Sequence, residues 1–163
     1  MAEAFLDRQL EQRGVKARVS SAGFLESGIP AMEYAVATMA DDGFDISGHR
    51  SRQLTPALVE AADLVVAMSR QHVIELAVMV PDAWPRLHRA WDLVRMAETT
   101  GPRAEYLDFG IWLDQVGAAR TRSSLMSASL ADDVADPVGQ PRPAYDRTKV
   151  ILNDLMTRLA ALI

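Results

Sequence analysis

The chain has 163 residues, of which 49% are apolar and 24% charged, a composition typical of one globular domain with a sizeable core. A net charge of −5 without any cluster of Lys and Arg excludes nucleic acid and anionic lipid as expected partners. The chain contains no cysteine, which excludes disulfides, thiolate metal sites and thiol nucleophiles built from these residues.

Targeting signals are equally sparse. No run of about 18 apolar residues could span a bilayer, and the first residues carry acidic groups instead of the basic start of a signal peptide. We therefore expect no membrane association and, by default, a cytoplasmic location. We also expect no cofactor and no metal ion.

The first half of the chain alternates helical and extended patterns. The predicted elements are a helix over 2–13, a strand over 16–23, a helix from Pro30 to Gly43, a helix from Thr55 to Ala62, a strand over 63–69 and a helix over 70–80. Thr55 is an expected N-cap with Pro56 in the first helical position. The run over 63–69 is continuously apolar between polar ends, which is typical of a buried parallel strand.

The second half is predominantly helical in pattern. A helix is expected around 91–98, a loop over 99–103, and helix-compatible sequence over 105–130 with an interruption near Gly117. A wide apolar stripe marks a C-terminal helix, with Ile151, Leu152, Leu155, Met156, Leu159 and Leu162.

Alternating strands and helices predict the fold class. Parallel strands joined by helical crossovers give a three-layer α/β/α open parallel sheet, here formed by a single domain over residues 1–163. Sites in such sheets form beyond the carboxyl ends of the strands, so the turns after residues 20–23 and 68–69 are the places to expect one.

Several short motifs occur in an order that resembles the low-molecular-weight protein tyrosine phosphatases. They are Ser21-Ala-Gly23, Gly28-x-Pro30-Ala31, Gly43-x-Asp45-Ile46-Ser47-x-His49-x-Ser51-Arg52-Gln53-Leu54, Ala62-Asp63-Leu64-Val65, Asp133-Val-Ala-Asp136-Pro137-x-Gly139 and Tyr145-x-Arg147-Thr148. The resemblance covers residues 1–98 and 131–163. Residues 99–130 match no known part of the family and are expected to be a helical insertion.

The resemblance implies that part of the family's site lies outside this chain. Family members open with a strand that runs into Cys-x5-Arg-Ser/Thr-Pro, directly followed by a stretch similar to Met1-Ala-Glu-Ala-Phe5. Met1 would then correspond to an internal methionine of the family, and the chain would be N-terminally truncated. The first strand, which is central in the family's sheet order 2-1-3-4, would be missing together with the nucleophile.

Three residues receive roles from the resemblance. Asp136 matches the general acid, an Asp on a Pro-bounded loop that can protonate a leaving oxygen. Ser21 and His49 match positions whose side chains hydrogen-bond the catalytic loop from behind. Without the resemblance, Asp136 is a turn residue before a proline, Ser21 lies in a turn at the end of a strand, and His49 is an ordinary surface histidine. Val138 replaces the family's usual aromatic residue, which weakens the expectation of phosphotyrosine specificity.

The remaining polar and aromatic candidates have simpler interpretations. Asp132 and Asp133 are expected to be solvated or capping residues, and His72 and His88 to be surface residues instead of metal ligands. Three tryptophans, Trp84, Trp91 and Trp112, are expected to be packing residues instead of a binding cage.

Three functions remain open. The first is a phosphatase of this family, which hydrolyses phosphate monoesters through a cysteinyl-phosphate and would be inactive in this chain. Its substrate would be a phosphotyrosine protein or a small aryl phosphate. The second is a non-catalytic pseudophosphatase that binds a protein partner at an exposed sheet edge. An arsenate reductase-like protein is the weakest, because the Asp-Pro loop and the downstream Tyr-x-Arg-Thr favour the phosphatases.

Overall fold

The computed structural model describes residues 1–122 and 129–163, which form two compact units. Unit 1 comprises Met1–Leu54 and Asp136–Ala160, and unit 2 comprises Thr55–Ala135 and Ala161–Ile163. Each unit is described separately below.

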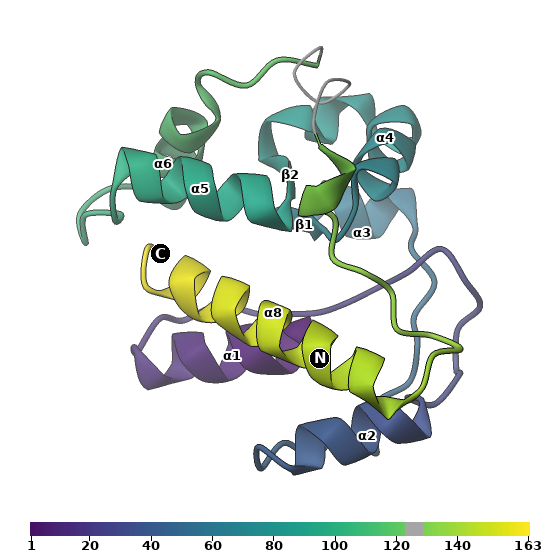
Figure 1. Ribbon diagram of the computed structural model, residues 1–163. Helices are drawn as coiled ribbons and strands as arrows, with labels where there is room; N and C mark the ends of the chain where they lie inside the picture. The colour runs from purple at the N-terminus through teal and green to yellow at the C-terminus, as the bar shows by residue number, and fades with distance from the viewer. Residues whose placement is uncertain (123–128) are drawn as a thin grey trace. The chain divides into compact units, whose positions relative to one another are not determined.

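Unit 1 is helical. It contains α1 (Ala2–Gln12), α2 (Glu33–Ala40) and α8 (Arg142–Ala160), and both shorter helices contact α8 (Figure 1). The helix predicted over 2–13 is confirmed, with Phe5 and Leu10 buried on the side expected from the apolar spacing. The predicted C-terminal stripe is buried at Leu155 and Leu159, although α8 begins well before residue 151.

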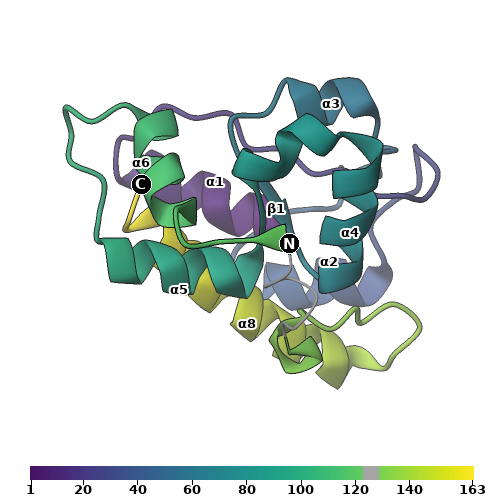
Figure 2. The same ribbon diagram turned by 90° about the horizontal axis from the view of Figure 1, so that it is seen from above.

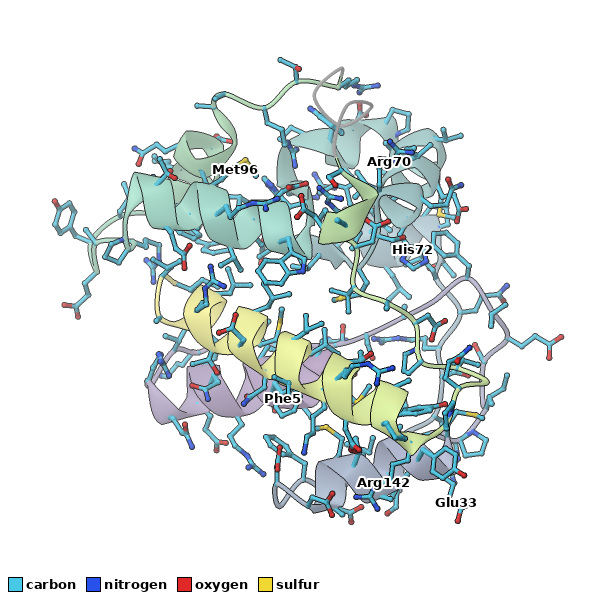
Figure 3. All side chains as sticks on the ribbon, viewed as in Figure 1. Phe5, Glu33, Arg70, His72, Met96 and Arg142 are labelled. Carbon is cyan, nitrogen blue, oxygen red and sulfur yellow. The ribbon has the colours of Figure 1, made fainter. Side chains whose placement is uncertain are left out.

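Polar contacts tie α2 to α8. The Thr38 hydroxyl donates to the Asp146 carboxylate, and the Lys149 ammonium lies 3.0 Å from Asp42 and 3.2 Å from the Thr38 carbonyl. Figure 3 shows the first residues of α8 and α2, Arg142 and Glu33, at the same end of this helix pair. These contacts fix the two helices that border the candidate site.

Two sequence predictions in unit 1 are corrected. The helix expected from Pro30 begins at Glu33, because Pro30 forms an isolated antiparallel bridge with Arg50. The strand expected over 16–23 is wrong. Within the described residues only Gly23 pairs there, in an isolated bridge with Gln53, and a strand cannot form without a partner along its length.

Unit 2 holds the sheet. Its elements are α3 (Pro56–Glu60), β1 (Val65–Ala67), α4 (Arg70–Met79), η1 (Pro81–Arg86), β2 (Leu87–Arg89), α5 (Ala90–Thr100), α6 (Phe109–Gly117) and η2 (Leu130–Asp132). The two strands are parallel, with Val65 opposite Leu87 and Ala67 opposite Arg89. This parallel pairing with helical connections confirms the predicted α/β class, and α5 lies against α6 in both views (Figure 1, Figure 2).

Side-chain caps start two helices of unit 2 as local chemistry requires. The Thr55 hydroxyl accepts the Leu58 N–H at 3.3 Å, which confirms the predicted N-cap of α3. The Ser69 hydroxyl accepts the His72 N–H at 3.2 Å at the start of α4, the helix predicted over 70–80. The strand predicted over 63–69 is confirmed at its centre, although only Ala67 of β1 is buried.

The second strand, β2, was absent from the sequence prediction, and His88 within it is not a surface residue. Its side chain is 0% exposed, and Nε2 lies 3.1 Å from the Pro85 carbonyl oxygen. Burial, followed by the positive charge of Arg120, lowers the pKa of His88 to about 3. The three residues of β2 are all buried, but too few for a periodic signal in the sequence.

The segment over 99–130 is helical in part. Helix α5 runs to Thr100 before Gly101, whose φ of 94° ends it, and α6 stops at Gly117 as predicted. Trp112 is buried, with Nε1 donating to the Gly101 carbonyl at 3.1 Å, whereas Trp84 and Trp91 are half-buried. Residues 123–128 of the predicted helical segment lie outside the described part of the chain.

The helices of the described residues are too short or too polar to cross a membrane.

Candidate functional site

A cavity of about 430 Å³ lies within unit 1, bordered by four segments that are distant in the sequence. They are the start of α1, the approach to α2, the turn over 45–49, and the Asp-Pro loop with the first turns of α8. Its lining residues are Met1, Glu3, Ala4, Asp7, Ala31, Met32, Ala35, Asp45, Ile46, His49, Asp136, Pro137, Val138 and Tyr145. A shallower depression of about 340 Å³ beside Lys149 and Asn153 contains none of the predicted site residues.

Asp136 lies in the cavity wall at the start of a tight turn. Its Oδ1 accepts the N–H of Val138 at 3.0 Å, so this side chain closes an Asx turn over Pro137. Pro137 is buried while Asp136 remains exposed, which leaves the carboxylate accessible from the cavity. An exposed carboxyl on a restrained turn has the access to solvent that a proton donor needs in order to be reprotonated.

His49 lies in the same wall, on the turn that follows Ile46. Its backbone N–H donates to the Ile46 carbonyl at 3.1 Å, and its side chain is exposed. The structure thus brings His49 and Asp136 together around one cavity. Neither role assigned to them by resemblance is tested by this placement, so both remain predictions.

Ser21 lies next to the cavity wall instead of in it. Its hydroxyl donates to a carboxylate oxygen of Glu3, which does line the cavity, and its carbonyl accepts from Arg52 Nη2 at 2.9 Å. Ser21 therefore orients a residue of the wall, and its predicted contact with a catalytic loop stays a prediction.

Sequence reasoning assigned no role to several wall residues. Glu3, Asp7 and Asp45 add three carboxylates to that of Asp136, and Tyr145 packs edge-on against Tyr34 with ring centroids 5.8 Å apart. Both Asp45 and Tyr145 lie in motifs that carried the resemblance. Their place in these motifs was the one sequence feature that could have identified them as site residues.

The electrostatics of the cavity are acidic. Among the described residues that line it, no Arg or Lys balances the four carboxylates. Hydrogen bonds from Ser47 lower the pKa of Asp45, which keeps that carboxyl ionised. An acidic wall of this kind can position polar groups, but its lining holds no Arg or Lys to neutralise a phosphate dianion.

A metal centre is not formed by the described residues. Across residues 1–122 and 129–163, no three His, Asp or Glu side chains are grouped to hold an ion. His72, on α4, is exposed as predicted (Figure 3).

Comparison with known proteins gives a consistent set of matches. The family model for low molecular weight phosphotyrosine protein phosphatase matches residues 1–99. A probable low molecular weight protein-tyrosine-phosphatase EpsP of Ralstonia solanacearum is 42% identical over 81 residues, which are 50% of this chain and 54% of that protein. Its namesake in Ralstonia nicotianae is 47% identical over 68 residues, 42% of this chain and 45% of that protein. The chain thus spans about half the length of these curated relatives.

Solved structures agree on the fold. A YwlE mutant from Bacillus subtilis superposes with a TM-score of 0.70 at 25% identity, covering 98% of this chain and 85% of that one. A low molecular weight protein tyrosine phosphatase from T. tengcongensis gives 0.68 at 25% identity, covering 97% and 86%. The Wzb protein of Vibrio vulnificus in complex with benzylphosphonate gives 0.67 at 20% identity, covering 98% and 86%.

Proposed function

Because the chain belongs to the low molecular weight phosphotyrosine protein phosphatase family, we propose that residues 1–163 supply the proton-donor side of a phosphatase site and turn over no phosphate ester by themselves. The observation that carries this proposal is the placement of Asp136 and His49 in the wall of one cavity. The reaction class is hydrolysis of a phosphate monoester.

The chemistry divides between groups that this chain has and groups that it lacks. In the family reaction a thiolate attacks phosphorus, the bond to the leaving oxygen breaks, and an acid protonates that oxygen. Water then hydrolyses the cysteinyl-phosphate. Asp136 can serve as the acid, whereas 163 residues without cysteine contain no thiolate.

The cavity is the place where the missing nucleophile and phosphate-binding loop would fit. By resemblance, His49 supports the phosphate-binding loop from behind and Asp136 faces it from the substrate side. The space between these two residues is the cavity of about 430 Å³. We propose that a Cys-x5-Arg loop supplied from outside residues 1–163 occupies it and brings the positive charge that the acidic wall lacks.

The first test is the activity of the chain as it stands. We expect no hydrolysis of para-nitrophenyl phosphate above background, and the Asp136→Asn variant should give the same rate. Turnover by the chain that disappears in this variant would overturn the expected inactivity.

The second test restores the absent groups. The strand and Cys-x5-Arg loop of a family phosphatase are fused before Met1, with a Cys→Ser version of that loop as the control. We expect hydrolysis that requires the cysteine and falls about 10²- to 10⁴-fold in Asp136→Asn. An active fusion indifferent to Asp136→Asn would show that another group is the acid.

Substrate preference follows from Val138, which is 59% exposed where the family usually has an aromatic side chain. An aliphatic residue offers less stacking surface to a substrate ring than an aromatic one. The proposed substrate remains a phosphotyrosine protein or a small aryl phosphate. The proposed location of the reaction is the cytoplasm. The active fusion should discriminate weakly between aryl and alkyl phosphates, and Val138→Tyr should increase the aryl preference.

A non-catalytic binding protein is the second candidate. It is supported by exposed apolar side chains in unit 1, with Leu25 79%, Met32 47% and Ile29 45% exposed. Recovery of a monomer that captures no partner in pull-downs would count against it. An arsenate reductase is a weaker third candidate, since it too requires a thiol.

A further inference from the structure

Arg89 is a buried cation at the carboxyl end of β2, and its side chain is 1% exposed. Nε and Nη2 donate to the two oxygens of Asp92 at 2.8 and 3.0 Å. Nη1 donates to the Ser129 carbonyl at 2.6 Å and to Asp133 Oδ1 at 3.0 Å, and Nη2 also lies 3.4 Å from Asp132. One guanidinium thus joins the start of α5 to residues 129–133.

Asp133 extends this connection to the other strand. The Oδ1 atom that accepts from Arg89 also accepts the Arg70 N–H at 2.8 Å, at the first residue of α4. The next residue, Val134, donates its N–H to the Met68 carbonyl at 2.8 Å, directly after β1. Residues 129–134 are therefore fastened to the carboxyl ends of both strands of unit 2.

Because Val134 is held at the end of β1, the short length of chain between Val134 and Asp136 limits where Asp136 can lie. Only Ala135 lies between Val134 and Asp136, so two steps along the chain join them, and a fully extended chain spans about 3.3–3.6 Å per step. While Val134 is held, Asp136 is confined to within roughly 7 Å of it. If residues 129–134 detached, Val134 would no longer be a fixed point for Asp136. The buried Arg89 guanidinium would then lose its bonds to residues 129–133 and keep only Asp92, which is unfavourable for a buried charge.

We propose that Arg89 is a positioning residue for the Asp-Pro loop: through Asp133 it holds the segment from which Asp136 extends. The functional meaning of this inference rests on the proposed role of Asp136 as the acid. The attachment itself can be measured without turnover.

The test is amide hydrogen exchange of residues 134–140 in the full chain. The amide proton shift of Val138 is measured as well, because it reports the hydrogen bond that this N–H donates to Asp136 Oδ1. Asp133→Asn keeps an acceptor for the Arg70 N–H but removes the charge that pairs with Arg89. We expect exchange in this segment to accelerate about 10- to 100-fold, while amides of α1 and α8 are unchanged. Arg89→Met should act in the same direction, and Arg89→Lys should recover part of the protection.

Arg95 provides the matched control. It also bonds Asp92 and Asp132, at 2.8 and 2.7 Å, but its side chain is 48% exposed and its ion pairs do not include Asp133. Arg95→Met should therefore leave exchange at residues 134–140 within about twofold of the parent.

Two results would overturn the inference. One is a folded Asp133→Asn protein whose segment 134–140 exchanges at the parent rate. The other is equal acceleration throughout unit 2, which would indicate general destabilisation. A third result is possible, in which exchange changes as expected but Asp136→Asn does not affect the active fusion. Arg89 would then still hold residues 129–134, but this would have no role in catalysis.

Discussion

His88 should make the stability of unit 2 strongly dependent on pH. The ring is fully buried in β2, and a β-carbon on Gly117 of α6 would lie 3.6 Å from its Cε1. The neighbouring charges are Arg120, which opposes protonation, and Asp92, which favours it, while Pro85 accepts the hydrogen bond from Nε2. Burial dominates, and the pKa falls from 6.5 to about 3.

The sign follows from proton binding in the two states. Between pH 6.5 and 3 the unfolded chain binds a proton at this histidine and the folded chain does not, so stability falls as the pH is lowered through that window. The full effect of the pKa difference is about 5 kcal/mol. Between pH 7 and pH 5, where most carboxylates remain ionised, the loss is about 2 kcal/mol.

The perturbation is His88→Gln, which keeps an N–H for the Pro85 carbonyl but cannot ionise. Urea unfolding followed by tryptophan fluorescence reports on unit 2, because Trp84, Trp91 and Trp112 all lie in it. The parent should lose about 2 kcal/mol more than this variant between pH 7 and pH 5. The exposed histidine His72 supplies the control, since His72→Gln should retain the parent's pH dependence. Equal losses in the parent and His88→Gln would refute the buried neutral histidine.

Three further changes test the fold. Thr55→Ala removes the N-cap of α3 and should cost about 1 kcal/mol by tryptophan-monitored unfolding, whereas Thr55→Ser should cost little. Met39→Ala leaves a cavity at a 0% exposed position and should cost about 2–5 kcal/mol of unfolding free energy. This unfolding is monitored by far-UV circular dichroism, because unit 1 lacks tryptophan. The control Met32→Ala, at 47% exposure, should stay within about 0.5 kcal/mol of the parent. Gly43→Ala places a β-carbon at φ 72° and should cost roughly 1–2 kcal/mol in the same assay, and an unchanged midpoint would contradict the left-handed conformation.

The site was only partly predictable from the sequence. Asp136 and His49 were identified through motifs, and the structure places both at one cavity. Glu3 and Asp45 lay in or beside those motifs, yet nothing in their local sequence indicated that they face the same space. Their meeting depends on how α1 and two loops pack in unit 1, which no short-range pattern encodes.

Errors in the fold prediction have the same origin. Pro30 has the local chemistry of a helix start, but its pairing with Arg50 delays α2 to Glu33. His88 is a polar residue of the kind expected at the surface, but it belongs to strand β2, which forms by pairing with β1. In both cases a long-range backbone partner outweighed local preference.

The sequence by itself determined the helices whose spacing and caps are local, such as α1, α3 and α4, the family through its ordered motifs, and the lack of any thiol among 163 residues. Tertiary structure alone decided which extended segments became strands, which polar side chains were buried, and which carboxylates share a cavity. The physical reason is range: helix caps and apolar spacing act within a few residues, whereas strand pairing and burial require partners that only the folded chain brings together.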